Sequence, residues 1–343
     1  MLRENPRHRI AIVGASSLRG KELKQVLEDR NFPVAEIVLL DTSVPVGTLA
    51  EAAGEPTFIR PMDRESFDGA RFVFFAGSAT EAIDNWKLAH DAGATIIDLT
   101  GTLDEAAHAA SWIPALDTLL APPEHKTGKF QGSGIFSSPA PSIIIACTLS
   151  AAFRKLSPVR LALLFFPPVS ERGQLGVEEL EKQTADLLLL RPITQVIFDT
   201  QVAFNLLAGY GEASRPTLAE MRGGISKGIA AYLGGRITVP AVQLVQAPVF
   251  YGYAFAAYAE FAEACEPAKL DSALAAAGIH IVAKDEPKPS NISVAGEGRI
   301  HLARAERDEN VSGGIWLWGV TDNLQLAAAN AVRIAEELLA PKI

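Results

Sequence analysis

The chain has 343 residues, of which 48% are hydrophobic and 21% charged, and its formal net charge is −9 at pH 7. This composition supports a large buried core over about two domains and excludes an intrinsically disordered protein. The negative charge argues against a nucleic-acid partner, which requires a basic face, and the longest apolar runs are shorter than the ~20 residues that cross a membrane. Two cysteines and no apolar leader segment predict a cytoplasmic protein without disulfides.

The first third of the chain alternates short apolar runs with helical patterns. The predicted strands are 9–13, 37–40, 72–76 and 94–99, and the clearest helices are 19–30 and 80–92. Strands and helices alternating at this spacing predict βαβ units and a parallel sheet. We therefore expect an α/β fold that begins with a Rossmann-type parallel-sheet domain over residues 1–137.

The pattern changes over residues 138–321, where longer strands lie among helices. The predicted strands are 159–168, 236–251, 299–307 and 313–320, and the predicted helices are 142–156, 175–190, 218–232 and 254–263. Such an arrangement favours an α+β domain with a mostly antiparallel sheet. An amphipathic helix is predicted in the last segment, 322–343.

A glycine turn, Gly14-Ala-Ser-Ser-Leu-Arg-Gly20, connects the first strand to the first helix. A phosphate at such a turn lies against backbone N–H groups at the positive end of the helix dipole. The middle glycine of the usual fingerprint is replaced by Ser17. Asp41, at the end of the second strand, is placed to bind a ribose 2′-hydroxyl and to repel a 2′-phosphate. These residues favour NAD over NADP, although a turn of this kind in an α/β fold can also lack a nucleotide.

Further motifs follow in order along the chain. They are Asn31-Phe-Pro-Val34, Ala94-Thr-Ile-Ile-Asp98, Ser170-Glu-Arg-Gly-Gln-Leu-Gly-Val-Glu-Glu-Leu180, Phe204-Asn205, Pro248-Val-Phe-Tyr-Gly252, Asp322-Asn-Leu324 and Asn330-Ala-Val-Arg-Ile-Ala-Glu336. Together with the glycine turn they resemble the aspartate-semialdehyde dehydrogenases, which begin with Gly-Ala-Thr-Gly-x-x-Gly and Arg-Asn-Phe-Pro.

The resemblance implies an N-terminal Rossmann-type domain, a C-terminal α+β catalytic and dimerisation domain of the semialdehyde dehydrogenase type, and a last helix that returns to the first domain. It also implies a homodimer. The cofactor-binding positions that it implies are Gly14, Ser16, Ser17, Leu18, Gly20, Asp41 and Asn323.

The family interconverts β-aspartyl phosphate and aspartate semialdehyde with a nicotinamide cofactor. This reaction needs a thiolate nucleophile, an acid/base group and arginines for the carboxylate and the phosphate. The family's cysteine lies in a Ser-Asn-Pro-Asn-Cys-Ser motif at a helix N-terminus, where the dipole lowers its pKa. The corresponding segment here is Ser137-Ser-Pro-Ala-Pro-Ser142. The resemblance therefore places Pro141, which has no nucleophile, at the cysteine position.

The other catalytic positions of the family are changed as well. The acid/base histidine corresponds to Tyr253 and the substrate-binding arginine to Gln246. The phosphate-binding arginine corresponds to Asp104, and the glutamine of the family's Tyr-Gln segment corresponds to Pro167. No catalytic residue of the family is therefore expected to be intact.

Other reactive residue types in the chain suggest no replacement site. Cys147, on the predicted helix of Pro141, is flanked by isoleucines and is expected to be a buried apolar filler. The pairs Glu178-Glu179 and Glu336-Glu337 are interpreted as solvated helix faces. The histidines show no metal-binding spacing and are interpreted as surface residues; they are His8, His90, His108, His125, His280 and His301. We expect no metal site.

Three hypotheses remain open from the sequence. The first is a family member without catalysis that keeps a dimeric scaffold for a structural, regulatory or ligand-binding role. The second is an NAD-dependent oxidoreductase of altered chemistry with Tyr253 as proton donor, and the third is residual semialdehyde dehydrogenase activity. The changed positions carry no cation and little polarity, which favours the first hypothesis. The small-molecule ligand is not identified by the sequence.

Overall fold

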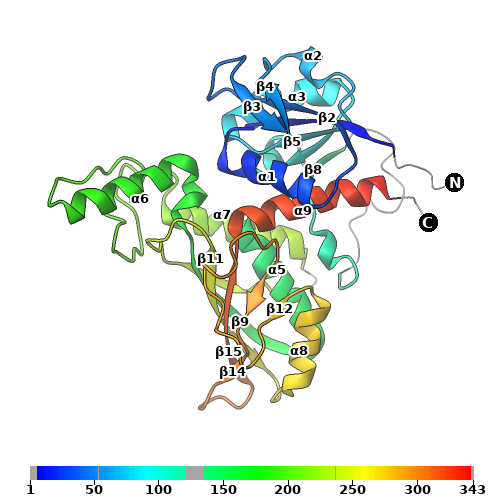
Figure 1. Cartoon of the computed structure of the whole chain (residues 1–343). Helices are drawn as coiled ribbons and strands as arrows, with labels where there is room; N and C mark the ends of the chain where they lie inside the picture. The colour runs from blue at the N-terminus through cyan, green and yellow to red at the C-terminus, as the bar shows by residue number, and fades with distance from the viewer. Residues whose placement is uncertain (1–5, 53, 121–133, 236, 341–343) are drawn as a thin grey trace. The chain divides into compact units, whose positions relative to one another are not determined.

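The computed structural model describes residues 6–52, 54–120, 134–235 and 237–340 (Figure 1). The chain divides into two compact units, unit 1 with residues 1–140 and 327–343, and unit 2 with residues 141–326. The chain leaves unit 1 after Ala140 and returns to it within helix α9 (Asn323–Leu339). The limits expected from the sequence, 1–137, 138–321 and 322–343, lie close to these.

Unit 1 contains a six-stranded parallel sheet of order β2-β1-β5-β6-β8-β7. The strands are β1 (His8–Val13), β2 (Val34–Leu40), β5 (Phe72–Phe75), β6 (Thr95–Asp98), β7 (Ala110–Ser111) and β8 (Ile135–Ser137). The other elements are α1 (Leu18–Asp29), α2 (Arg64–Phe67), α3 (Ala79–Asp91), α4 (Leu103–Ala106), the 3₁₀ turn η1 (Pro114–Leu116) and a hairpin of β3 (Leu49–Ala52) and β4 (Glu55–Phe58). The Rossmann-like parallel sheet predicted from the sequence is confirmed.

Successive residues of the central strands contribute to two different cores. In β1, Ile10 and Ile12 pack in a cluster with apolar residues of α1 and of the second half of α9. Ala11 and Val13 pack in a second cluster with residues of α2, α3 and α4. Because side chains of a strand alternate between the faces of a sheet, helices cover both faces. The strands therefore read as continuous apolar runs, as parallel strands do.

Unit 2 contains a seven-stranded mixed sheet of order β10-β9-β11-β15-β13-β12, with β14 also paired to β15. The strands are β9 (Pro158–Phe166), β10 (Ala241–Leu244), β11 (Tyr253–Phe261), β12 (His280–Ile281), β13 (His301–Leu302), β14 (Glu306–Arg307) and β15 (Gly314–Thr321). The helices are α5 (Pro141–Phe153), α6 (Gly173–Leu188), α7 (Leu218–Leu233) and α8 (Pro267–Ala276), and short 3₁₀ turns are η3 (Arg154–Leu156) and η4 (Val169–Arg172). The long strands pair antiparallel, as expected.

The helix predicted over residues 254–263 is wrong, because this segment is strand β11 in the centre of the sheet. Its alanine content suits a helix, but burial alternates strictly along the strand, with Phe255, Ala257 and Ala259 buried. Pairing with β9 on one side and β15 on the other overrides the local preference. The strand predicted over 236–251 is likewise reduced to the four residues of β10.

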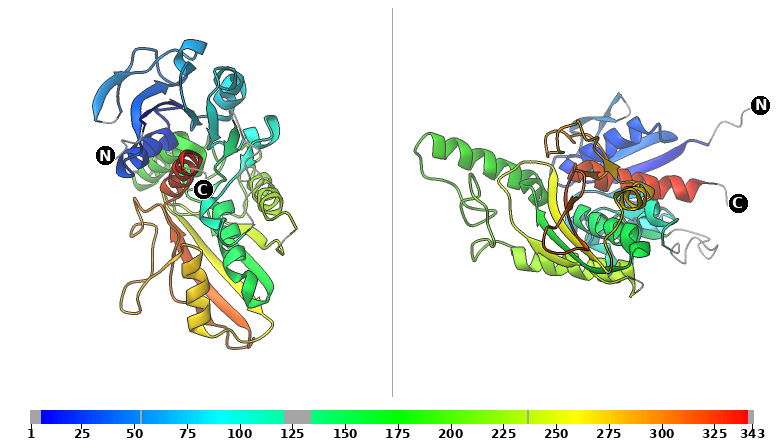
Figure 2. Two further views of the ribbon diagram at one scale, coloured as in Figure 1. Left: turned by 90° about the vertical axis from the view of Figure 1, so that its right-hand side faces the viewer. Right: turned by 90° about the horizontal axis from the view of Figure 1, so that it is seen from below.

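The two faces of the mixed sheet differ. Helix α5 is buried on nearly all sides and contacts α7, α8 and β9, as expected for an apolar helix inside a core. Helix α6 extends from the sheet on the side opposite to α5 and α8 (Figures 1 and 2). Across the described residues, every helix is too short or too polar for a membrane span.

Candidate functional site

The glycine turn of unit 1 is fixed by close backbone packing. Gly14 has a φ of +78°, and a Cβ there would collide with the backbone of Gly77, in the loop after β5. A Cβ on Gly20 would collide with the carbonyl oxygen of Gly14. Both glycines therefore let the turn approach neighbouring backbone at the carboxyl edge of the sheet, where Rossmann-type sheets bind their ligands.

Ser17 caps helix α1. Its φ of −65° is accessible to any residue, and its hydroxyl accepts the Gly20 N–H at 2.9 Å. The same hydroxyl donates to the carbonyl oxygen of Ala76 at 3.0 Å. The serine therefore uses one of the helix N–H groups that a phosphate would otherwise meet. Ser16 and Leu18, the neighbouring predicted cofactor-binding residues, are half-buried.

Asp41 connects this turn to the loop after β2. One carboxylate oxygen accepts the Ser16 N–H at 2.8 Å and the Ser16 hydroxyl at 2.6 Å, and the other accepts the Ser43 N–H at 2.7 Å and the Ser43 hydroxyl at 2.5 Å. Burial alone raises the pKa of Asp41, but these hydrogen bonds outweigh it and hold the pKa below its usual range. The side chain is 5% exposed. A ribose hydroxyl would have to compete with the two serines for this carboxylate.

A second carboxylate, Glu81, lies at the same edge and was missed in the sequence. It forms a capping box with Ser78 at the start of α3, and its other oxygen accepts the Thr42 N–H at 3.0 Å and the Thr42 hydroxyl at 2.7 Å. The sequence signal that could have identified Glu81 is the capping-box spacing Ser-x-x-Glu before an apolar run. Asp41 and Glu81 thus place two carboxylates at the carboxyl edge of the parallel sheet, which together form its anionic edge.

Arg19 supplies a cation to this region. Its guanidinium donates to the carbonyl oxygens of Leu99 at 2.7 Å and Gly77 at 2.9 Å. These hydrogen bonds connect helix α1 to the loops after β5 and β6. Asp98, at the end of β6, accepts hydrogen bonds from Thr100 and Leu103, and its pKa is raised, mainly by burial.

In unit 2, Pro141 is the first residue of the 13-residue helix α5 and is buried. Proline suits this position because the N–H that it lacks would have no intrahelical acceptor. The next residue, Ser142, is also buried and is hydrogen-bonded through its side chain to Tyr253. The predicted position Tyr253 is thus hydrogen-bonded to the residue that follows the predicted position Pro141.

Tyr253 is the first residue of β11 and is 1% exposed. Its ring packs edge-to-face on Phe165, with ring centroids 5.5 Å apart. Burial, and next the charge of Glu171, raise the pKa of Tyr253 well above its ordinary value. The side chain is therefore a neutral phenol that fills the core of unit 2.

Both polar atoms of the Gln246 side-chain amide form hydrogen bonds inside the protein. Nε2 donates to the carbonyl oxygens of Pro167 at 2.9 Å and Ala247 at 2.8 Å, and Oε1 accepts the Tyr210 hydroxyl at 2.6 Å. The backbone of Gln246 pairs in both directions with Leu207. Tyr210 was missed in the sequence because no local pattern connects it with a residue so far along the chain.

Asn323, the first residue of α9, is 1% exposed. Its amide nitrogen donates to the Ser170 hydroxyl at 3.1 Å and to Glu171 at 2.9 Å. Its amide oxygen accepts the Gly252 N–H at 3.1 Å. The predicted cofactor-binding side chain is therefore engaged within unit 2.

Cys147 and Asp104 are the other reactive side chains considered from the sequence. Cys147 is fully buried and its pKa is raised by burial to about 12, as expected for an apolar filler. Asp104 is exposed on α4. The described residues include no group of three or more histidine, cysteine, aspartate or glutamate side chains arranged for a metal ion.

Two interpretations of polar residues need correction. Glu179 is buried, not solvated, and accepts backbone N–H groups of residues 196–198. His301 is buried beside His280, with ring centroids 5.0 Å apart, so it is not a surface residue. His125 lies outside the described residues.

Comparison with known protein families gives matches over most of the chain. Residues 9–123 match the semialdehyde dehydrogenase NAD binding domain. Residues 160–326 match the semialdehyde dehydrogenase dimerisation domain.

Individual proteins are similar over almost their whole length. The chain is 29% identical over 333 residues to the USG-1 protein homolog of Pseudomonas aeruginosa, covering 96% of this chain and 97% of that protein. It is 29% identical over 353 residues to the aspartate-semialdehyde dehydrogenase of Aquifex aeolicus, covering 97% and 98%.

Solved structures have the same fold. A probable aspartate-semialdehyde dehydrogenase from Pseudomonas aeruginosa superposes with a TM-score of 0.85 at 28% identity, over 98% of this chain and 100% of that chain. Aspartate semialdehyde dehydrogenase II from Vibrio cholerae gives a TM-score of 0.85 at 24% identity, over 97% and 98%. The second likeness is one of fold.

Proposed function

The chain belongs to the aspartate-semialdehyde dehydrogenase family, and we propose that it is a member without the family's covalent catalysis, a dimeric protein with a structural, regulatory or ligand-binding role. The observation that carries this proposal is Pro141, a buried residue without a nucleophile at the start of α5. A thioacyl intermediate requires a thiolate. The proposal is supported by the resemblance, which implies that this position corresponds to the family's cysteine.

The remaining thiols do not offer a substitute. The whole sequence has two cysteines. Burial raises the pKa of Cys147 to about 12, which leaves the thiolate negligible at neutral pH. The pKa of Cys265 is also raised, mainly by burial. Because a catalytic thiol has a lowered pKa, both observations support the loss of thiolate chemistry.

The surroundings of Tyr253 argue against the second hypothesis, in which this residue donates a proton to a substrate. An efficient acid has a pKa near the working pH, whereas burial raises the pKa of Tyr253 far above it. The hydroxyl is hydrogen-bonded to Ser142 and its ring packs on Phe165. These contacts support a packing role.

Gln246 argues in the same direction. An arginine binds a carboxylate through two parallel N–H groups, whereas Gln246 is neutral and all its side-chain hydrogen bonds go to Tyr210, Pro167 and Ala247. A dianionic substrate would find no cation at this position.

For unit 1 we propose that NAD binds more tightly than NADP. Asp41 and Glu81 are acidic residues at the carboxyl edge of the parallel sheet, and both would repel a 2′-phosphate. We also propose a homodimer, supported by the dimerisation-domain match, and a cytoplasmic location, supported by two cysteines that are both free.

The test is steady-state absorbance at 340 nm with purified protein, aspartate semialdehyde, phosphate and either NAD or NADP. A dimeric sample whose circular dichroism shows a folded protein, measured beside an active enzyme of the family, is expected to give no turnover above the blank. If the wild-type protein does turn over substrate and Tyr253→Phe does not, the proposal would be overturned in favour of relocated acid chemistry. Turnover retained in both Cys147→Ala and Tyr253→Phe would show that other residues catalyse and would equally overturn it.

A further inference from the structure

Two histidines of unit 2 lie together at one edge of the mixed sheet. His280 is in β12 and His301 is in β13, and the parallel pairing of these strands places the two residues opposite each other. Their ring centroids are 5.0 Å apart in an edge-to-face arrangement. His301 is 5% exposed, whereas His280 is half-buried. A proton taken up by either ring would therefore place a cation beside a second titratable ring.

The carboxylate nearest to this pair is already bound to an arginine. Oε2 of Glu297, in the segment before β13, lies 3.1 Å from Nε2 of His301. The same oxygen accepts Nε of Arg299 at 3.0 Å and lies 2.9 Å from a terminal nitrogen of that guanidinium. The Arg299 hydrogen bond holds the pKa of Glu297 below its usual range, so the carboxylate stays ionised in mildly acidic solution. Its negative charge is therefore largely offset before any histidine is protonated.

The surroundings of His301 oppose a positive charge on its ring. Among the described residues, the titratable groups that act on it are Glu297, Arg299 and His280, and β15 places the apolar Val320 opposite it. Burial, above all, lowers the pKa of His301; Glu297 raises it, and His280 and Arg299 lower it again. A lowered pKa means that the neutral ring stabilises the closed edge above about pH 6.5, and that this contribution is lost as the pH falls through the folded-state value.

Helix α8 is the other element that packs on β12. Its charged residues are Lys269, which forms an ion pair with Glu266 at 3.4 Å, and Asp271. Neither is among the groups that act on His301 across the described residues. Charge on the histidine pair is therefore decided within β12, β13 and the segment that joins them.

The strand pairing at this edge is short. Strands β12 and β13 have two residues each, and β12 is the edge strand of the sheet. The His280 N–H donates to the carbonyl oxygen of Ile300 at 2.9 Å, and the Val282 N–H donates to that of Leu302 at 3.0 Å. Short edge elements with few backbone hydrogen bonds open at a lower free energy than central strands do. The edge can therefore open while β9, β11 and β15 stay paired.

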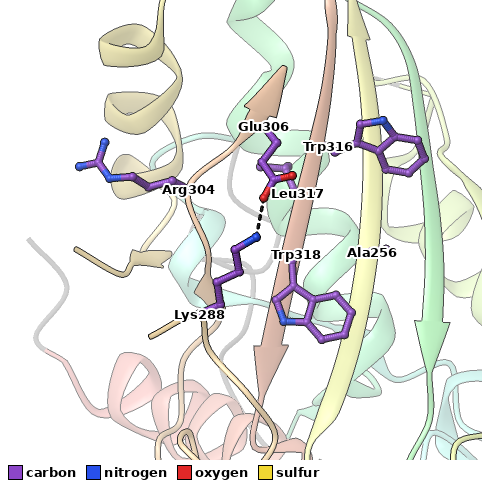
Figure 3. A pocket seen from close by; sticks show the side chains of 7 residues that line it. All are labelled: Ala256, Lys288, Arg304, Glu306, Trp316, Leu317 and Trp318. Carbon is purple, nitrogen blue, oxygen red and sulfur yellow. Dashed lines mark hydrogen bonds and ion pairs between the residues drawn. The ribbon is translucent and has the colours of Figure 1, made fainter. Parts of the chain in front are cut away.

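The middle of the segment between β12 and β13 is held by contacts that involve no histidine. Lys288 forms an ion pair with Glu306 at 2.5 Å (Figure 3). Nε1 of Trp318 donates to the carbonyl oxygen of Pro289 at 2.9 Å. Because protonation of the histidines leaves these contacts in place, opening is expected on either side of them, over residues 279–282 and 294–302.

The segment before β13 is also hydrogen-bonded to the start of α9. The Gly296 N–H donates to Oδ2 of Asp322 at 2.9 Å, and the Thr321 hydroxyl donates to the carbonyl oxygen of Arg299 at 2.9 Å. Oδ1 of Asp322 accepts two N–H groups of the first turn of α9. Opening of the edge would remove one hydrogen bond from this capping carboxylate, which directly precedes the buried Asn323.

We propose that His280 and His301 form a pH-sensitive switch: when they take up protons, residues 279–282 and 294–302 open and release the start of α9. At neutral pH the edge is closed around an uncharged His301. In mildly acidic solution each added proton places a further cation beside Arg299, where Glu297 is already engaged, and repulsion between these like charges favours the open edge. The switch requires neither a nucleotide nor catalysis.

Hydrogen exchange measured by mass spectrometry at pH 7.5 and pH 5.0 tests the switch on the full chain. Protection is each observed rate divided into the intrinsic rate of the same peptide at the same pH. His301→Gln and His280→Gln remove the two titrating rings one at a time and leave a neutral side chain. His90→Gln, in α3 of unit 1, is the control for the loss of a histidine elsewhere. Circular dichroism at pH 7.5 checks that each variant is folded.

In the wild type and His90→Gln, protection of residues 294–302 is expected to fall about tenfold or more at pH 5.0, while β11 keeps its protection. Each tenfold difference in proton affinity between the open and the closed edge gives a tenfold change in the opening equilibrium. A smaller fall is expected in His280→Gln and the smallest in His301→Gln; if His301→Gln does not fold, His280→Gln decides. Equal protection of the wild type at both pH values would overturn the switch. So would a fall that is undiminished in His280→Gln, or one that extends equally to β11, because other groups would then cause it.

Discussion

The Tyr210 hydroxyl donates to Gln246 Oε1 at 2.6 Å. This hydrogen bond completes the pairing of the buried Gln246 side chain, which stands where the family resemblance implies an arginine. The two residues lie far apart in the sequence but are joined by the backbone pairing of Leu207 with Gln246. Burial, above all, raises the pKa of Tyr210, so the phenol is a neutral donor at physiological pH. The pair is a neutral hydrogen bond at the position where the resemblance implies a cation.

Removing the Tyr210 hydroxyl is expected to destabilise the protein. Tyr210→Phe leaves Gln246 Oε1 buried without a donor, which costs about 1–3 kcal/mol. Chemical denaturation at a fixed protein concentration measures this difference, because a dimer's stability depends on concentration. Tyr251→Phe, at an exposed ring, is the control and is expected to change the free energy of unfolding by less than about 0.5 kcal/mol. Equal effects of the two variants would contradict the importance of the Tyr210 bond.

Asp41 is expected to make the free energy of unfolding depend on pH in the acidic range. Its folded-state pKa is lowered below an unfolded value of about 3.9. The carboxylate therefore contributes stability that is fully present above about pH 4 and is lost as the pH falls through the folded-state value. Asp41→Asn replaces an acceptor oxygen by an amide nitrogen facing Ser16 or Ser43 and is expected to cost about 1–3 kcal/mol at pH 7.

The measurement is a pair of denaturation curves for the wild type and Asp41→Asn at pH 7 and pH 3. The stability gap between them is expected to shrink at pH 3, because the wild-type carboxylate is by then losing its contribution. Asp84→Asn, at an exposed aspartate of α3, is the control for the loss of one charge. A gap of the same size at both pH values would refute the role assigned to Asp41.

NAD is expected to bind at least about tenfold more tightly than NADP, since one added repulsion of about 1.4 kcal/mol accounts for that ratio. Isothermal titration with each nucleotide gives the two dissociation constants. Substituting Asp41→Asn and Glu81→Gln together is expected to narrow the ratio, whereas Asp84→Asn is expected to leave it unchanged. Equal or tighter binding of NADP to the wild type would remove the argument from the anionic edge.

The sequence predicted the parallel sheet well, because continuous apolar strands and capped helices are local signals. Its main error, the helix predicted over 254–263, has a physical cause: alanines favour a helix when neighbours are ignored, whereas pairing with β9 and β15 decides the outcome in the protein. The same alternation of buried and half-buried positions is visible in the sequence only when the aromatic residues Tyr253, Phe255 and Phe261 are weighted above the alanines.

The site was predictable only in part. The departures proposed at Pro141, Tyr253 and Gln246 were inferred from the motifs beside them, whereas the hydrogen-bond partners of these residues could not be inferred in this way. Tyr210 is hydrogen-bonded to Gln246, which lies far from it in the sequence. No periodic pattern in the sequence predicts such a contact. Asp41 shows the opposite case, because its place after β2 suggested a ligand-binding carboxylate, whereas Ser16 and Ser43 occupy it.

Glu179 provides the last prediction, which concerns the rigidity of the segment that follows α6, residues 194–203. Glu179→Ala leaves the N–H groups of residues 196–198 without their carboxylate acceptor, and each such loss costs about 1–3 kcal/mol where the group stays buried. Hydrogen exchange measured by mass spectrometry is expected to show faster exchange over residues 194–203, with little change in the strands of the mixed sheet. Glu178→Ala, at the exposed neighbouring position, is the control and is expected to exchange like the wild type. Unchanged exchange of residues 194–203 in Glu179→Ala would mean that other contacts, such as those of Gln183, hold this segment without the buried carboxylate.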